Sequence, residues 1–344
     1  MPCRTTSTKS CNVESSTAIY SCNLCTSLIQ NDGFIAPSPS FRLASVVVME
    51  VTMQQIAVLG TGAMGSRLVE NLMEAGYSVA VYNRTQERAE PLVLKGATYM
   101  ATPRAAAKGA EVVISMVRDD EASRQIWLAD DIGAVHGIAE GAIAIELSTL
   151  TVDWTRTLAA AIANHNHAFL AVPVVGSRPQ AEAKQLIGLV GGAQAALAQV
   201  QPLLEAAGIS SLQWVGSAAQ SMAMKLAVNA LFGIQVAALA ELLASLGRSE
   251  ISREQAMDIF SQLPVLSPAA RGAGSLMQKE QHSPLFPIEL VEKDFRYAIN
   301  AAQTSGNIDE FSAPVTTAVW QLYQQAATQQ YGHVNITGII NLFT

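Results

Sequence analysis

The sequence predicts an α/β protein in which an N-terminal domain, with an open parallel sheet covered by helices on both faces, precedes an all-helical C-terminal domain. Two observations carry this prediction. Up to Gly216, short apolar segments typical of buried strands alternate with helical segments. Beyond Gly216 the strand pattern stops and alanine-rich helical stretches follow. The first of these stretches would form a long interdomain helix.

The elements follow in order from Gln54. The stretch QQIAVLGTGAMGSRLVENLMEAGYSVAVYNRT reads as an apolar strand, a glycine turn, an amphipathic helix closed by Gly76, and a second strand. Further strands, buried on both faces of a parallel sheet, are expected at residues 111–117, 142–148, 168–175 and 186–192. Helices of the second domain are expected at 218–247, 252–262, 289–305 and 311–328. The predicted domains are therefore 54–216 and 217–344.

Residues 1–48 form an extension that we set apart from the fold. They are rich in Ser and Thr and lack the apolar run behind basic residues that marks a secretory signal. They read either as an organelle transit peptide or as upstream sequence joined by a misassigned start codon, with Met49 or Met53 as the true beginning. All four cysteines lie here, so we expect no disulfide and no thiolate metal site in the body of a cytoplasmic protein, unless the extension directs import into an organelle.

Composition limits the partners. The 344 residues carry 21 Lys and Arg against 28 Asp and Glu, a formal net charge of -7, which gives a nucleic-acid surface no electrostatic support. The apolar helix that begins at Met222 is interrupted by Lys225, Asn229, Gln235 and Glu241, which favours a core helix over a membrane span. We expect a small-molecule substrate, and neither a metal, nucleic acid nor membrane.

The glycine turn has the spacing G-x-G-x-x-G at Gly60, Gly62 and Gly65, directly after a strand and at the start of a helix. In this context the glycines permit a tight turn, close approach of a pyrophosphate to bare backbone, and packing of helix on strand. The motif therefore predicts a Rossmann dinucleotide-binding domain. The cofactor contacts expected at this turn and at the end of the strand 111–117 are Gly60, Thr61, Gly62, Ala63, Met64, Gly65, Met116 and Val117.

The end of the second strand indicates which cofactor is preferred. An NAD-selective site carries an acid there to accept from the ribose hydroxyls, but this chain has Asn83, Arg84 and Thr85. Arg84 supplies a planar cation, and its two neighbours supply neutral donors, for a 2′-phosphate. We expect NADP(H) to be preferred, with NAD(H) also admitted.

Lys225 and Asn229 are the candidate catalytic pair. A lysine buried among apolar neighbours loses basicity, so it can donate a proton near neutral pH to the oxygen of a carbonyl that receives a hydride. Asn229, one helical turn along, would fix its rotamer. The alternative is a core lysine that extends to water, which would be preferred without the upstream motif.

With these motifs the chain resembles the β-hydroxyacid dehydrogenase family, which includes 3-hydroxyisobutyrate dehydrogenase and the glyoxylate and succinic semialdehyde reductases. The resemblance spans roughly residues 54–343. It rests on motifs that the sequence reads as VLGTGAMG with YNRT, LSTL at 147–150, VPVVGSRPQAEAKQL at 172–186, MKLAVN at 224–229 and FPIELVEKD at 286–294.

The resemblance implies hydride transfer between NADPH and a small aldehyde or keto acid, with a β-hydroxyacid as product, in a homodimer or homotetramer that assembles through the helical part. Lys225 would be the general acid and base, and Asn229 its companion. Thr149 and Lys293 would contact the cofactor. The residues that would bind or enclose the substrate are Ser148, Val175, Gly176, Ser177, Phe286 and Asp294, with the backbone N–H groups of Gly176 and Ser177 holding a carboxylate.

Several positions depart from the family pattern. Val175 stands where a substrate-binding serine is usual, which removes a charge-assisted hydrogen bond of about 1.5–3 kcal/mol. Ala171 stands where an acid often precedes the proline, and Ala219 and Ser221 replace glycines and are expected to crowd the cofactor or shift the helix start.

Two other classes share this architecture. Imine reductases reduce C=N bonds but typically carry Asp or Tyr where this chain has Lys225. Non-catalytic relatives that serve in chromatin have lost the lysine, and the acidic charge of this chain also argues against that role.

Overall fold

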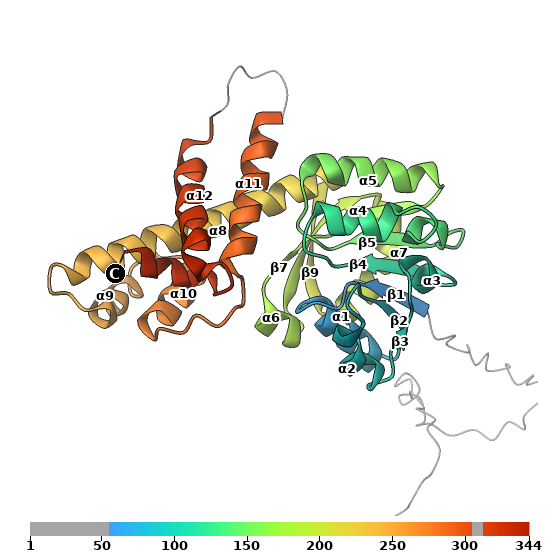
Figure 1. Cartoon of the computed structure of the whole chain (residues 1–344), viewed down its shortest axis with the longest axis horizontal. Helices are drawn as coiled ribbons and strands as arrows, with labels where there is room; N and C mark the ends of the chain where they lie inside the picture. The colour runs from blue at the N-terminus through green and yellow to red at the C-terminus, as the bar shows by residue number, and fades with distance from the viewer. Residues whose placement is uncertain (1–54, 305–311, 344) are drawn as a thin grey trace, which may run out of the picture. The chain divides into compact units, whose positions relative to one another are not determined.

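The computed structural model describes residues 55–304 and 312–343, and Figure 1 shows their elements. Within them, one sheet has the strand order β3-β2-β1-β4-β5-β6-β8-β7, with β9 paired to β8. The strands are β1 Gln55–Leu59, β2 Ser78–Tyr82, β3 Thr98–Tyr99, β4 Val112–Ser115, β5 Ile143–Glu146, β6 Ala168–Ala171, β7 Val174–Val175, β8 Leu186–Gly192 and β9 Ile209–Gly216.

The sheet is mostly parallel, as expected, but its last part is mixed. Strands β1 to β6 pair in parallel, whereas β8 runs antiparallel to β6 and β7. The strand expected at 168–175 is interrupted at Pro173, whose ring nitrogen has no N–H for the ladder. Strand β9 was not expected, because its Ser and Gln side chains obscure the apolar pattern of a strand that is only partly buried.

Helices cover the sheet and form the second domain. Those that follow strands are α1 Gly65–Glu74, α2 Glu90–Val93, α3 Pro103–Ala107, α4 Asp120–Leu128, α5 Val152–Asn164, α6 Arg178–Glu182 and α7 Gln194–Ala206, with short 3-10 turns at Gln86–Arg88 and Ala134–His136. Those of the second domain are α8 Ala218–Gly247, α9 Arg253–Phe260, α10 Pro268–Gln278, α11 Ile288–Thr304 and α12 Pro314–Ala326, followed by the π segment Ala327–Tyr331 and the 3-10 segment Ile336–Leu342.

The four helices expected after Gly216 are present, and the one at 218–247 has the predicted bounds. The end of the helix expected at 289–305 and the start of that expected at 311–328 lie outside the described residues. Helix α10 was missed because PAARGAGSLMQ contains a proline and two glycines, which lower its helix propensity.

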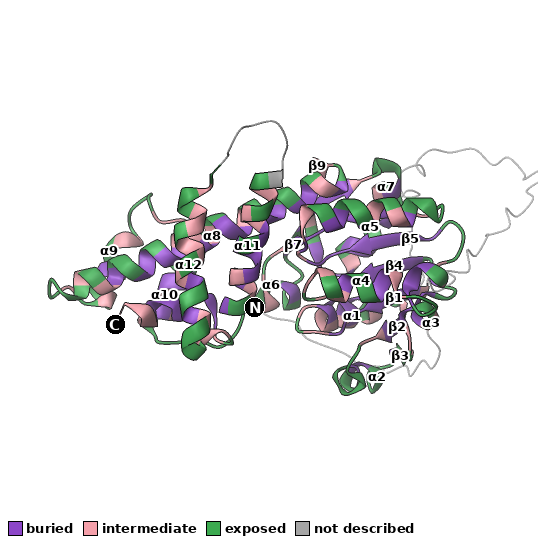
Figure 2. Cartoon of the chain, turned by 45° about the horizontal axis from the view of Figure 1, so that its top comes forward, coloured by how far each residue is buried: buried purple, intermediate pink, exposed green. Residues whose placement is uncertain are grey.

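Three apolar cores organise these elements, and their buried residues follow the strands and the inner helix faces in Figure 2. One core lies between the sheet and α1, α6 and α7; a second lies between the sheet and α3, α4 and α5. The third lies among the C-terminal helices. Helix α8 enters two of them, because Met222 packs in the second core and Val236 in the third. The interdomain helix is therefore part of both domains.

The start of α8 is fixed by polar contacts. Ser217 caps the helix and donates its N–H to Gln220 Oε1 at 2.8 Å, while its Oγ accepts from the Gln220 N–H at 3.3 Å. Ser221 is fully buried and its Oγ donates to the Leu189 carbonyl at 2.8 Å. Ser221 therefore fastens α8 to β8.

In the described part of the chain, one helix, α8, is long and apolar enough to meet the criteria for a membrane span, with a mean hydropathy of 1.8. Half of that window is buried inside the protein. The core helix of a soluble protein meets the same criteria.

Candidate cofactor and catalytic site

The glycine turn joins β1 to α1, and at two of its three glycines there is no room for a side chain. Gly60 has φ +104°, and a Cβ there would lie 2.3 Å from the Met116 carbonyl oxygen. A Cβ on Gly65 would lie 2.0 Å from the Gly60 oxygen, whereas one on Gly62 would meet nothing within 4 Å. Gly60 and Gly65 thus allow the close turn, and Gly62 leaves open space beside the backbone.

These residues fit the phosphates of a dinucleotide. Helix α1 begins after Met64 without a side-chain cap, so its first N–H groups can serve a ligand. Thr61 is buried, and its Oγ1 has no hydrogen-bond partner among the described residues. An unpartnered buried hydroxyl is costly unless a ligand completes it. Ala63 is exposed in the same turn.

Asn83 supports the turn from the end of β2. Its Oδ1 accepts from the Thr61 N–H at 3.1 Å and its Nδ2 donates to the Thr85 carbonyl at 2.8 Å. The amide predicted to contact the cofactor is thus already used in part to hold the loop. Arg84 and Thr85 are exposed beside it.

A buried carboxylate at the end of β5 bonds to α4 and to Ser148, which in turn bonds to the residue that follows β4 by two positions. Glu146 is fully buried, and it accepts from Ser123 Oγ and Trp127 Nε1 at 2.9 Å and from the Ser148 N–H at 3.0 Å. Burial raises its pKa, which these donors oppose. Ser148 Oγ in turn accepts from the Val117 N–H at 2.7 Å. Two residues predicted to face ligands, Val117 and Ser148, are therefore held in register.

Lys225 lies on α8, 6% exposed. Its Nζ donates to Asn229 Oδ1 at 2.9 Å, and Asn229 Nδ2 donates to Asp294 Oδ2 at 2.6 Å. Burial lowers the pKa of Lys225 from 10.5 to about 8; Asp294 acts to raise it and Lys293 to lower it. An ammonium with a pKa of about 8 can release its proton more readily than an exposed lysine.

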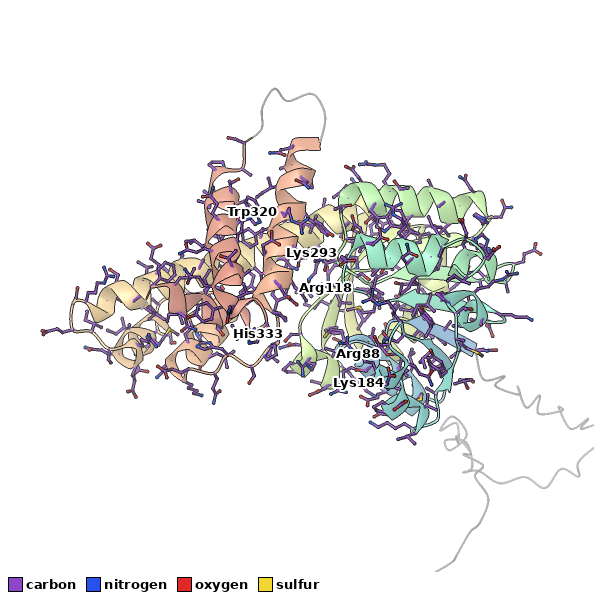
Figure 3. The ribbon with its side chains drawn as sticks, viewed as in Figure 1. Arg88, Arg118, Lys184, Lys293, Trp320 and His333 are labelled. Atoms are coloured by element: carbon purple, nitrogen blue, oxygen red, sulfur yellow. The ribbon has the colours of Figure 1, made fainter. Side chains whose placement is uncertain are left out.

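Lys293 connects this group to the sheet. It is 7% exposed on α11, and its Nζ donates to the Thr149 carbonyl at 2.7 Å and pairs with Asp294 Oδ1 at 2.9 Å. Figure 3 labels Lys293 of α11 and Arg118, which lies in the loop before α4. Arg118 pairs with Glu289 of α11 at 3.5 Å. Contacts thus run from the loop after β5 to the lysine of α8.

The turn predicted to bind substrate forms a second group. Val175 ends β7 half-buried, Gly176 has φ +125°, and Ser177 caps α6. Both the Ser177 N–H and its Oγ donate to Gln180 Oε1, at 2.9 and 3.0 Å. The N–H that was expected to hold a carboxylate is therefore bonded within the turn.

Phe286 is half-buried in the loop before α11. Its N–H donates to Asn335 Oδ1 at 3.0 Å, and its carbonyl accepts from the Ile336 N–H at 2.8 Å. Arg178 joins this loop to the substrate turn, because its Nη2 donates to the Pro284 carbonyl at 2.6 Å. The C-terminal segment thus holds Phe286 in place.

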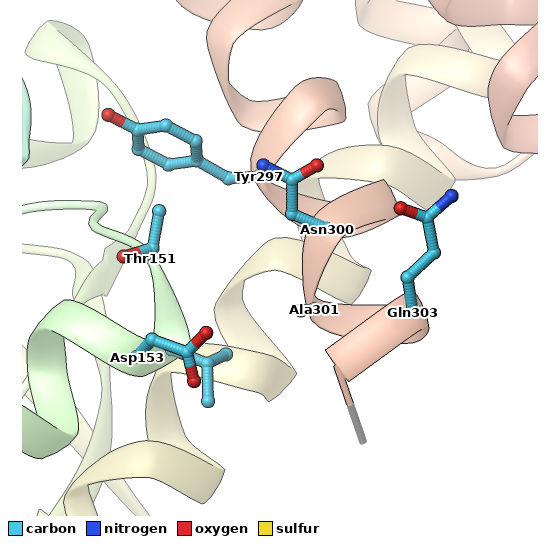
Figure 4. A pocket seen from close by; sticks show the side chains of 7 residues that line it. Thr151, Asp153, Tyr297, Asn300, Ala301 and Gln303 are labelled. Atoms are coloured by element: carbon cyan, nitrogen blue, oxygen red, sulfur yellow. The ribbon is translucent and has the colours of Figure 1, made fainter. Parts of the chain in front are cut away.

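Two hollows lie beside α11. One of about 460 Å³ is lined mainly by charged residues of α4, the loop before it and α11, among them Arg118 of the loop and Lys293. The other, of about 200 Å³, is shown in Figure 4 and is lined by Thr151, Asp153, Tyr297, Asn300 and Gln303 and their neighbours. None of the residues that line the second was predicted for the site, whereas the first includes Lys293.

Sequence reasoning missed two residues of this region. Glu146 could have been found from the sequence, because it is an acid at the end of an otherwise apolar strand. Gln180 completes the pattern Ser-x-x-Gln, a capping box readable from Ser177 and Gln180 alone.

The fold and the site define a class. A dinucleotide-type glycine turn at the start of a parallel sheet, followed by a helical domain that carries a buried, titratable lysine, is the arrangement of an NAD(P)-dependent oxidoreductase.

Comparison with known proteins agrees. Residues 55–216 match the NAD binding domain of 6-phosphogluconate dehydrogenase, and residues 219–343 match the NAD-binding domain of NADP-dependent 3-hydroxyisobutyrate dehydrogenase. The uncharacterized oxidoreductase YfjR of Bacillus subtilis is 35% identical over 72% of this chain and 87% of its own. Glyoxylate/succinic semialdehyde reductase 1 of Arabidopsis thaliana is 29% identical over 83% and 97%.

The fold has a close counterpart among solved structures. The structure of 3-hydroxyisobutyrate dehydrogenase from Mycobacterium tuberculosis with L-serine superposes with a TM-score of 0.76 at 24% identity, over 84% of this chain and 99% of that one. The chain belongs to the β-hydroxyacid dehydrogenase family.

Proposed function

We propose that the protein reduces the carbonyl group of a small substrate with NADPH, and that Lys225 is its general acid. The observation that carries this proposal is the Lys225–Asn229–Asp294 chain: an ammonium with a pKa of about 8, held at 2.9 Å by an amide that a buried carboxylate orients at 2.6 Å. Such a group is protonated at neutral pH and can release its proton readily.

In this reaction, one group of residues would hold the cofactor and another would donate the proton. Bound NADPH would supply the hydride. The glycine turn and the start of α1 would hold the pyrophosphate, and the ends of β4 and β5, kept in register by Glu146, would support the nicotinamide end. Lys225 Nζ would donate a proton to the carbonyl oxygen, where negative charge develops, and Asn229 would keep Nζ directed.

The cofactor preference rests on the end of β2. Arg84 is exposed and can pair with a 2′-phosphate. Asn83 stands where an NAD-selective site carries an acid, so the repulsion between such an acid and the phosphate is avoided. The description of the family model that matches residues 219–343 also names an NADP-dependent enzyme. We therefore propose NADP(H) as the preferred cofactor.

Replacement of Lys225 tests the function. Lys225→Met keeps the volume and removes the proton, so we expect kcat to fall by about a hundredfold or more while the dissociation constant for NADPH changes little. The exposed Lys279→Met, in the same domain, is the matched control. NADPH binding can be followed by the change in cofactor fluorescence. A Lys225→Met variant that kept more than about half of the wild-type kcat, with chemistry rate-limiting, would exclude the acid role.

We also propose that the chain is a homodimer or homotetramer joined through its helical domain. Met224, Leu231 and Leu242 are 46%, 59% and 51% exposed along one side of α8, which supports a partner surface there. Light scattering on the wild type and on Leu231→Glu measures the assembly: a monomeric wild type would contradict the proposal.

A further inference from the structure

The turn Val175–Ser177, which the family resemblance assigns to the substrate carboxylate, offers no free side-chain donor. A carboxylate in a pocket needs a cation or several charge-assisted hydrogen bonds. Val175 offers an apolar side chain, and Ser177 directs both its N–H and its hydroxyl to Gln180 Oε1, at 2.9 and 3.0 Å. Donors at two of the three positions are thus absent or already engaged.

Gln180 also opposes an anion directly. Its Oε1 is a carbonyl oxygen, so it presents negative partial charge within the turn. The side chain is exposed, and its two hydrogen bonds from Ser177 hold its Oε1 in the turn. A carboxylate could accept from Ser177 only if the two hydrogen bonds between Ser177 and Gln180 were broken first.

The nearest cation along the chain is directed elsewhere. Arg178 follows the turn, but its guanidinium donates to the Pro284 carbonyl at 2.6 Å and so links the turn to the loop of Phe286. The half-buried Val175 and Phe286 supply apolar surface. This combination suits an uncharged chain on the substrate.

We propose that the substrate is a neutral aldehyde or ketone that carries an apolar chain where related substrates carry a carboxylate, and that Val175 and Gln180 determine this choice. The inference rests on the proposed function. In the reaction, the C=O π bond breaks, a hydride from NADPH forms the new C–H bond, and the Lys225 ammonium gives its proton to the oxygen. The products are a neutral alcohol and NADP⁺, and solvent reprotonates Lys225.

Matched substrates test the proposal. Pentanal and succinic semialdehyde are nearly isosteric aldehydes that differ in a terminal carboxylate, and propanal and glyoxylate form a second such pair. We expect the wild type to show kcat/KM at least about tenfold higher for the neutral member of each pair. A wild type that favoured the acids would overturn the inference while leaving the proposed function standing. Reduction of none of the four, with NADPH bound, would overturn both.

Two substitutions identify the residues responsible. Val175→Ser restores a hydroxyl, and Gln180→Ala frees the Ser177 donors; each should raise kcat/KM for the acids by about tenfold, the worth of one hydrogen bond to a charged group. The control is Gln255→Ala, which also removes a Gln three residues after a helix-capping serine, Ser252, but on α9. If Gln180→Ala fails to fold, Val175→Ser, which changes the end of β7 at a half-buried position, decides alone.

A binding measurement gives a second readout that does not depend on turnover. With NADP⁺ present, glycolate, the reduced form of glyoxylate, should leave the Tm of the wild type unchanged and should raise that of Val175→Ser. Glycolate that stabilised the wild type as strongly as the variant would show that the turn already accepts a carboxylate, and the inference would be wrong.

Discussion

Lys225 should destabilise the folded protein by an amount that depends on pH. The folded state lowers its pKa from 10.5 to about 8, because burial disfavours the ammonium. Holding the charge at about pH 7 therefore costs about 3 kcal/mol of folding free energy. Between these two pKa values the unfolded chain binds more protons than the folded one, so wild-type stability rises with pH there.

Lys225→Met removes this cost. At about pH 7 the variant gains about 3 kcal/mol, and at about pH 9.5 only about 1 kcal/mol, because the wild type then folds largely with a neutral amine. The substitution also leaves Asn229 Oδ1 without its donor at 2.9 Å, a penalty of about 1–3 kcal/mol that is the same at both pH values. The penalty cancels when the two pH values are compared.

Parallel urea denaturation of the two proteins at both pH values measures the effect. The difference in free energy of unfolding, variant minus wild type, should fall by about 2 kcal/mol from about pH 7 to about pH 9.5. All other titrating groups are shared and cancel. The exposed Lys279→Met controls for the exchange of a lysine for a methionine. A difference that stays constant between the two pH values would refute the claim that Lys225 is held in a desolvated site.

Three further results are expected. In the reduction direction, kcat/KM should decline above about pH 8 as Lys225 loses its proton. Asp294→Asn should move this decline to lower pH, because the carboxylate raises the Lys225 pKa. A decline that did not move would contradict the coupling of the two residues. NADPH should be preferred over NADH by more than about tenfold in kcat/KM, and Arg84→Ala should shrink that ratio; equal use of both cofactors by the wild type would exclude this role for Arg84. Glu146→Leu should lower the free energy of unfolding by at least about 2 kcal/mol, because it leaves the buried N–H groups of Trp127 and Ser148 without their acceptor. Urea denaturation measures this loss of stability. A smaller loss would mean that these groups find other partners.

The fold could be predicted in outline because its signals are local. The spacing of Gly60, Gly62 and Gly65 and the apolar strands mark the sheet, and the capping serine and long apolar run mark α8 with the bounds the structure has. The reversal of β8 could not be predicted, since strand direction depends on how a connection crosses the sheet rather than on the strand's own residues. Pro173 was the one visible hint of a break.

The hydrogen bonds of the candidate site residues were predictable only in part. Lys225 and Asn229 are one helical turn apart, so their hydrogen bond follows from the sequence. The partner of Ser221 lies 32 residues away in the sequence, on β8, so it could not be read from local spacing. Ser177 bonds to its near neighbour Gln180, which competes with any ligand for its N–H group. A side chain's identity shows what it can donate, whereas packing decides to which neighbour it donates.

Helix α8 has a consequence for how the molecule unfolds. Its first turns complete a core of the sheet domain at Met222, and its later turns form the centre of the helical domain around Val236. Neither domain can lose this helix and keep its own interior, so the two should melt in a single cooperative transition. Lys225 lies along this helix between the two cores, so a local unfolding of α8 at either end would also disturb Lys225. Lys225, the proposed proton donor, therefore lies on the helix that both cores share, and it should stay ordered until the two domains unfold.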